Sequence, residues 1–67
     1  MLPQAQLQSL CKILDNKISQ GYRYLRSDQL PILNGAVVVI YLQLPTDIDT
    51  LFIIRIYPRG DTNEFQA

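Results

Sequence analysis

The chain has 67 residues, of which 48% are hydrophobic, and six Lys and Arg balance six Asp and Glu. This length fits one small domain, which removes only roughly 60% of its unfolded surface from water on folding. A net charge of zero and a pI of about 6.0 are untypical of proteins that bind nucleic acid chiefly through its phosphates. The apolar content excludes a disordered chain, and weak electrostatic repulsion between copies favours association.

The single cysteine, Cys11, excludes an intramolecular disulfide and a metal site built from several cysteines. The N-terminus lacks the basic and apolar regions of a signal peptide. The longest apolar run, Ala36 to Leu42, has seven residues, whereas a bilayer span needs roughly 20. We therefore expect a cytoplasmic protein without a membrane partner, because lone cysteines are typical of reducing compartments.

The first segment, Pro3 to Gln20, is predicted to be an amphipathic helix that Gly21 ends. Cys11 falls within the apolar stripe, so we expect it to be a small core residue. Gln6 falls on the opposite, polar side. The stripe repeats at spacings of three and four residues and consists of Leu7, Leu10, Cys11, Leu14 and Ile18.

The segment from Tyr22 to Leu33 gives a mixed signal and is predicted to be an edge strand. Its tyrosines favour a pleated surface, and Pro31 lacks the backbone donor that a central strand needs. Asn34-Gly35 predicts a tight type I′ turn, because both residues tolerate positive φ. The residues on either side can then pair as a hairpin.

The second half predicts two long antiparallel strands, Ala36–Leu44 and Leu51–Tyr57, which are rich in β-branched residues. A polar connection of hairpin length, 45–50, joins them. Residues 59–67 are predicted to be a polar C-terminal tail. The expected fold class is α+β, with an N-terminal amphipathic helix packed on a small antiparallel sheet in the order α-β-β-β, as one domain over residues 1–58.

Both faces of the two long strands are apolar over most of their length. An antiparallel sheet with one face in water alternates between apolar and polar residues instead, and a single helix can cover only one face. We therefore expect a homodimer or larger oligomer. The alternative is a monomer in which residues 22–33 fold over the second face. The predicted self-association residues are Val37, Val39, Tyr41, Leu51 and Ile53.

The sequence offers little for catalysis. It has no histidine, the commonest general base and metal ligand. Its acidic residues are scattered, and Asp47-Ile48-Asp49 lacks the ligand number and the glycine of a calcium loop, so we interpret it as turn chemistry. We expect no enzyme, no catalytic, cofactor-binding or metal-binding residues, and no cofactor.

Arginine and tyrosine concentrate beyond residue 21, and both are frequent in the energetically dominant parts of protein interfaces. The sequence thus predicts a non-catalytic interaction protein (adaptor, assembly factor or inhibitor) that self-associates and binds another protein. The alternative is a nucleic-acid-binding regulator, because the same residue types stack bases and bind phosphates. The predicted partner-binding residues are Tyr22, Arg23, Tyr24, Arg26, Arg55 and Tyr57.

Overall fold

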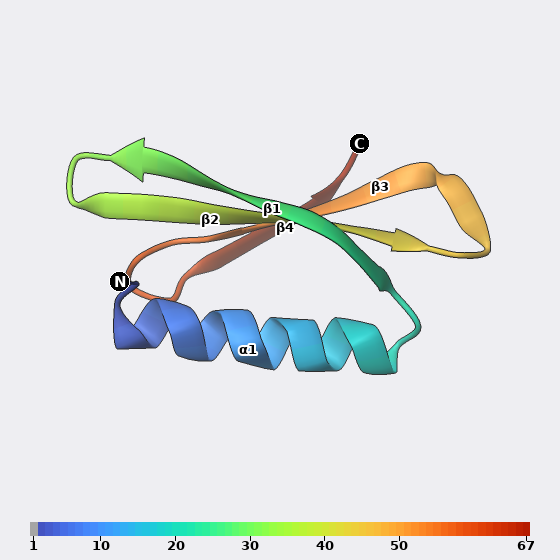
Figure 1. The fold of residues 1–67 in the computed structure, drawn as a ribbon, viewed down its shortest axis with the longest axis horizontal. Coiled ribbons are helices and arrows are strands. Elements are labelled where there is room, and N and C mark those ends of the chain that lie inside the picture. The colour runs from blue at the N-terminus through green and yellow to red at the C-terminus, as the bar shows by residue number, and fades with distance from the viewer. Residues whose placement is uncertain (1) are drawn as a thin grey trace.

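A computed structural model describes residues 2–67, which form one helix and a four-stranded antiparallel sheet (Figure 1). The strands follow one another in the sheet in chain order, so that β1 and β4 are the edges and the helix lies along one face only. The predicted α+β class with an N-terminal helix on an antiparallel sheet is confirmed. The elements are α1 (Gln4–Ser19), β1 (Arg23–Ile32), β2 (Gly35–Leu44), β3 (Asp47–Ile56) and β4 (Thr62–Gln66).

Helix α1 has nearly the predicted bounds but is rotated about its axis relative to the prediction. Leu10 and Leu14 pack against the core as expected, and Ile13 joins them. Cys11, expected in the core, is exposed. Gln6, expected on the polar side, is the one polar residue classed as fully buried among residues 2–67. The contact face therefore lies to one side of the most apolar stripe.

The reason for the rotation is a hydrogen-bonding role for Gln6. Its Nε2 donates to the backbone oxygens of Ala36 and Ile56, both at 2.8 Å. These two carbonyls belong to the neighbouring strands β2 and β3, so the amide ties the first turn of the helix to the end of the sheet. The Oε1 atom of Gln6 is buried without a partner. Burial of this amide is thus only partly compensated.

The turns differ from the sequence prediction in position. Leu33 and Asn34 form the two-residue connection between β1 and β2, with Ile32 paired with Gly35. The predicted type I′ turn at Asn34-Gly35 is wrong, because Gly35 (φ 135°) already belongs to β2 and no described residue other than glycine has a positive φ. Strand β3 also begins earlier than predicted, directly after a turn at Pro45 and Thr46.

A fourth strand occupies part of the segment expected to be a tail. Phe65 pairs with Ile53, and Glu64 with Ile54, across β4 and β3. The connection between these strands runs against α1: a Cβ atom added at Gly60 would lie 3.0 Å from the Ser9 hydroxyl and 3.2 Å from the Ala5 oxygen. Because Gly60 also has φ 94°, only glycine fits there without strain.

The hydrophobic core lies between α1 and the two central strands. Its fully buried members alternate along β2 and β3, as expected for side chains that share one sheet face. Tyr22 and Phe52 pack at its edge with ring centroids 5.3 Å apart, and Lys17 lies over the Phe52 ring at 4.4 Å. Within residues 2–67 no helix is long and apolar enough to cross a membrane. The core consists of Val38, Ile40, Leu42, Ile54 and Ile56.

Candidate interaction surface

The sheet face opposite α1 carries no helix or other layer (Figure 1); we call it the open face. Its side chains come from all four strands, because the pairing register aligns the residues that alternate with the core positions. Two rows cross it from β1 to β4. One row is Arg26, Tyr41, Ile53 and Phe65, and the other is Asp28, Val39, Arg55 and Asn63.

Two arginines lie over aromatic rings on the open face. The Arg26 guanidinium carbon is 4.6 Å from the centre of the Tyr41 ring, and that of Arg55 is 4.8 Å from the centre of the Phe65 ring. Arg26 also pairs with Asp28 at 3.4 Å while its side chain stays 66% exposed. Each guanidinium therefore packs on a ring, while both arginine side chains remain exposed to a partner.

The aliphatic residues of the open face are less accessible than the sequence suggested. Val37 and Val39 are only 6% and 4% exposed, although no helix lies over this face (Figure 1). Val39 lies directly between Asp28 and Arg55 in the register, and long charged side chains cover neighbouring apolar surface with their stems. The chain therefore covers part of its second apolar face with its own arginines.

The predicted partner-binding residues divide between the two faces. Arg26, Arg55 and Tyr57 lie on the open face, among the residues predicted for self-association. Tyr22 lies on the helix side, partly buried against the core. Tyr24 also pairs on the helix side, opposite Leu42, and its hydroxyl donates to Ser27 Oγ at 2.9 Å.

The remaining predicted residues border the same surface. Arg23, at the start of β1, is exposed and pairs with Gln43. Tyr41, Leu51 and Ile53 are partly exposed. Except for Tyr22 and Tyr24, the two predicted sets thus share the open face, which can bind only one partner at a time. Asp28 and Phe65 also belong to the open face but were not among the residues predicted from the sequence. Phe65 lies in strand β4, which was not predicted.

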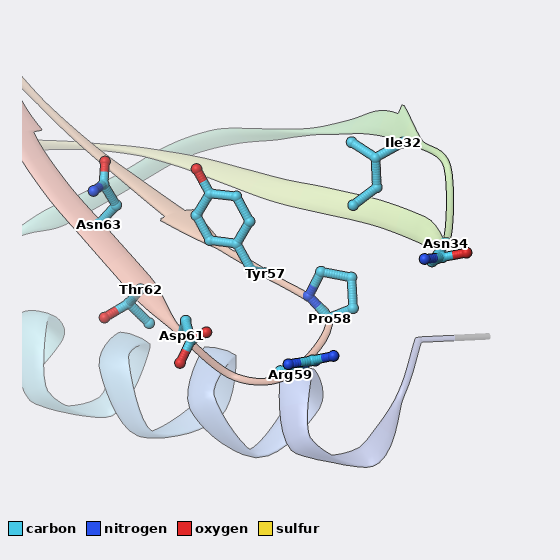
Figure 2. A pocket seen from close by; sticks show the side chains of 8 residues that line it. All are labelled: Ile32, Asn34, Tyr57, Pro58, Arg59, Asp61, Thr62 and Asn63. Atoms are coloured by element: carbon cyan, nitrogen blue, oxygen red, sulfur yellow. The ribbon is translucent and has the colours of Figure 1, made fainter.

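An open hollow of about 680 Å³ lies at one end of the open face, between the β1–β2 turn and the β3–β4 connection. Figure 2 shows the Tyr57 ring within it, Ile32 across from the ring on β1, and Arg59 and Asp61 on the connection. The connection is held by Gly60 N–H donating to the Tyr57 oxygen at 2.8 Å. The lining residues are Ile32, Asn34, Tyr57, Pro58, Arg59, Asp61, Thr62 and Asn63.

The chemistry of this surface is that of recognition. Its groups are guanidinium, phenol, amide and carboxylate, arranged around apolar rings and aliphatic side chains. Within residues 2–67 no group of three or more His, Cys, Asp or Glu side chains could hold a metal ion. No protein-family model, curated protein or solved structure matches the chain at a significant level. Its own residues therefore provide the basis for proposing a function.

Proposed function

We propose that the chain is a small non-catalytic interaction protein, an adaptor, assembly factor or inhibitor, whose open face binds another protein. The observation that supports this is the pair of arginine–aromatic stacks, Arg26 on Tyr41 and Arg55 on Phe65, beside the hollow around Tyr57. Arginine and aromatic residues dominate the binding energy of many interfaces. Stacking lowers the entropy that each guanidinium loses when it binds.

The size of the open face fits such a contact. Four strands at about 4.8 Å spacing are about 19 Å wide, and a ten-residue strand is about 33 Å long. Because β4 has only five residues, the face measures roughly 550 Å², somewhat below the ~800 Å² that each partner contributes to a standard interface. The hollow adds depth at one end, where it can take a side chain of the bound protein.

Self-association remains part of the proposal, but the open face cannot bind a second copy and another protein at once. We assign this face to the other protein, because Val37 and Val39 contribute little accessible surface for a second sheet. We also propose a cytoplasmic location. The exposed thiol of Cys11 is suited to a reducing compartment, since exposed thiols oxidise readily elsewhere.

The test is affinity capture from the native host with two matched charge reversals. Arg55→Glu alters the open face, whereas Lys12→Glu makes the same charge change on an exposed position of α1. We expect the wild-type chain and Lys12→Glu to retain the same protein, and Arg55→Glu to lose it while its circular dichroism is unchanged. Equal retention by all three chains, or retention of nothing, would contradict the proposal.

Nucleic acid is the second candidate ligand, since an open antiparallel sheet with exposed aromatic and arginine side chains can stack unpaired bases. Arg26 is already paired with Asp28 and the net charge is zero, so we place this candidate behind a protein partner. Fluorescence anisotropy with single-stranded DNA and RNA separates the two. Binding that weakens steeply with salt and is lost in Arg55→Glu would favour nucleic acid.

A further inference from the structure

Helix α1 has an apolar strip that the sheet does not cover. Leu7 and Ile18 are 39% and 54% exposed, Cys11 is exposed, and Leu14 lies at the boundary with the core. We call these four residues the helix flank. Their spacings of four, three and four residues are those of the seam along which one helix packs against another.

The flank faces the β1 edge of the sheet. The opposite side of α1 is tied to the β4 edge, because Ser9 Oγ donates to the Gly60 oxygen at 2.8 Å and Lys17 pairs with Glu64 at 3.8 Å. Ser9 lies about half a helical turn around the axis from Cys11 and Ile18, at 100° per residue. Since β1 and β4 are opposite edges, the flank is turned toward β1.

Beside the flank, part of the helix-side sheet face lacks a covering element. A helix is about 10 Å wide, whereas four strands at about 4.8 Å spacing span about 19 Å. The helix-side residues of β1, including Ser27, Gln29 and Pro31, are exposed, and Tyr24 is 44% exposed. Because the helix-side residues of β2 and β3 are buried in the core, the uncovered strip under β1 is one strand wide, about 5 Å. A helix packed beside α1 would rest partly on this strip.

We propose that a second copy of the chain supplies this helix, so that the two α1 helices pack side by side and parallel through their flanks. The two sheets then lie on opposite sides of the helix pair, because an antiparallel pair would force the two overhanging β1 edges into the same space. Each helix presents its polar back, with Gln8 and Asp15, to the polar Ser27 and Gln29 of the other copy's β1. This inference rests on the self-association part of the proposed function but uses a different surface.

Charge and area agree with a second copy as the occupant. None of the four flank residues is charged, and the net charge of the chain is zero, so two copies meet without strong repulsion. A 16-residue helix is about 24 Å long. Contact along half its perimeter and with the uncovered strip under β1 buries roughly 500 Å² on each copy, or about 1,000 Å² in total, which is the lower limit for a specific interface.

The parallel arrangement places Cys11 opposite the same residue of the second copy, and this gives a sharp experiment. Copper phenanthroline with oxygen should join the two thiols in a disulfide, the oxidant taking two electrons and two protons being released. Because Cys11 is the only cysteine, every disulfide dimer must pass through the flank. We expect rapid cross-linking of the wild-type chain at micromolar concentration, and none in Cys11→Ser.

Sedimentation equilibrium provides the second readout, with a mass twice the 7.7 kDa of one chain. Leu7→Glu and Ile18→Glu should weaken the dimer at least tenfold and slow the cross-link. Asn16→Glu adds the same charge on an exposed position away from the flank and should change neither. If a flank variant fails to fold by circular dichroism, the wild-type cross-link still decides the question.

Three results would overturn the inference: a wild-type monomer at every concentration, a dimer that does not cross-link through Cys11, or a dimer that both flank variants leave intact. Ile53→Glu, on the open face, separates this outcome from the proposed function. If Ile53→Glu alone disrupts the dimer, the second copy lies on the open face. Loss of the captured protein in Arg55→Glu would support the proposed function whichever surface forms the dimer.

Discussion

The buried amide of Gln6 allows a quantitative test of how the helix is held on the sheet. Replacing Gln6 with Glu keeps the size of the side chain but removes the Nε2 donor that the Ala36 and Ile56 oxygens accept at 2.8 Å. An ionised carboxylate at this fully buried position would face two carbonyl oxygens. We expect the new carboxyl group to stay protonated in the folded state, with a pKa raised by burial and by these dipoles.

The magnitude follows from the proton balance. An unfolded Glu has a pKa of about 4.3. If the folded carboxyl group stays neutral, the free energy of unfolding falls by about 1.36 kcal/mol for each pH unit between 4.3 and 7, or by about 3.7 kcal/mol in total. One donated hydrogen bond is lost in addition, at about 1 kcal/mol. Because the folded pKa is the higher one, the folded state binds more protons above pH 4.3, and stability falls as pH rises.

Urea denaturation followed by circular dichroism between pH 3 and pH 7 measures this difference. Gln6→Glu should be destabilised by about 1 kcal/mol at pH 3, where only the hydrogen bond is lost, and by about 4 to 5 kcal/mol at pH 7. Gln6→Met is the control without a titrating group. It should follow the pH dependence of the wild-type chain, because the methionine side chain binds no proton in either the folded or the unfolded state. A Gln6→Glu profile parallel to that of the wild-type chain would refute the reasoning.

Three further predictions concern stability. Gly60→Ala should cost about 1 to 3 kcal/mol in urea denaturation, because its Cβ would crowd the helix and the residue has φ 94°; an unchanged midpoint would show that the connection can move away. Leu42→Ala should cost about 2 to 5 kcal/mol, whereas Ile48→Ala, at a position 71% exposed, should stay within about 0.5 kcal/mol; similar losses would contradict the assigned core. Lys17→Met removes a cation 4.4 Å from the Phe52 ring centre and should lower the free energy of unfolding by about 1 kcal/mol. Thermal melts at low and high salt measure this loss.

The sequence was informative where apolar residues recur with a clear period. The β-branched runs of β2 and β3 identified the central strands, and Pro31 identified β1 as an edge strand. The rotation of α1 was not predictable from periodicity, because Leu7 and Ile18 make a more apolar stripe than Gln6 and Lys17 do. Only the tertiary structure reveals that a glutamine amide can bind two strand carbonyls and that a lysine stem can lie over aromatic rings.

The candidate surface was predicted in composition and only partly in position. The sequence selected Arg55, Tyr57 and Val39 for two separate sets, whereas the strand register aligns them on one face. Strand β4 was missed because its residues are mostly polar and Gly60 interrupts the segment before it. An edge strand can nevertheless form with few apolar residues. The stack of Arg55 on Phe65 could therefore not be predicted, since it joins neighbouring strands through a pairing that local propensity does not encode.

The ties between helix and sheet also constrain the order of folding. Each strand pairs with the next one along the chain, so the sheet forms through short loops. The hydrogen bonds from Gln6 to Ile56 and from Ser9 to Gly60 span 50 and 51 residues, and such contacts carry the largest loop-closure entropy and form late. The helix is synthesised before β3 and the β3–β4 connection, which contain the acceptors of these hydrogen bonds. Until those segments follow, the nascent helix stays undocked, and the apolar residues on both its sides are accessible to chaperones.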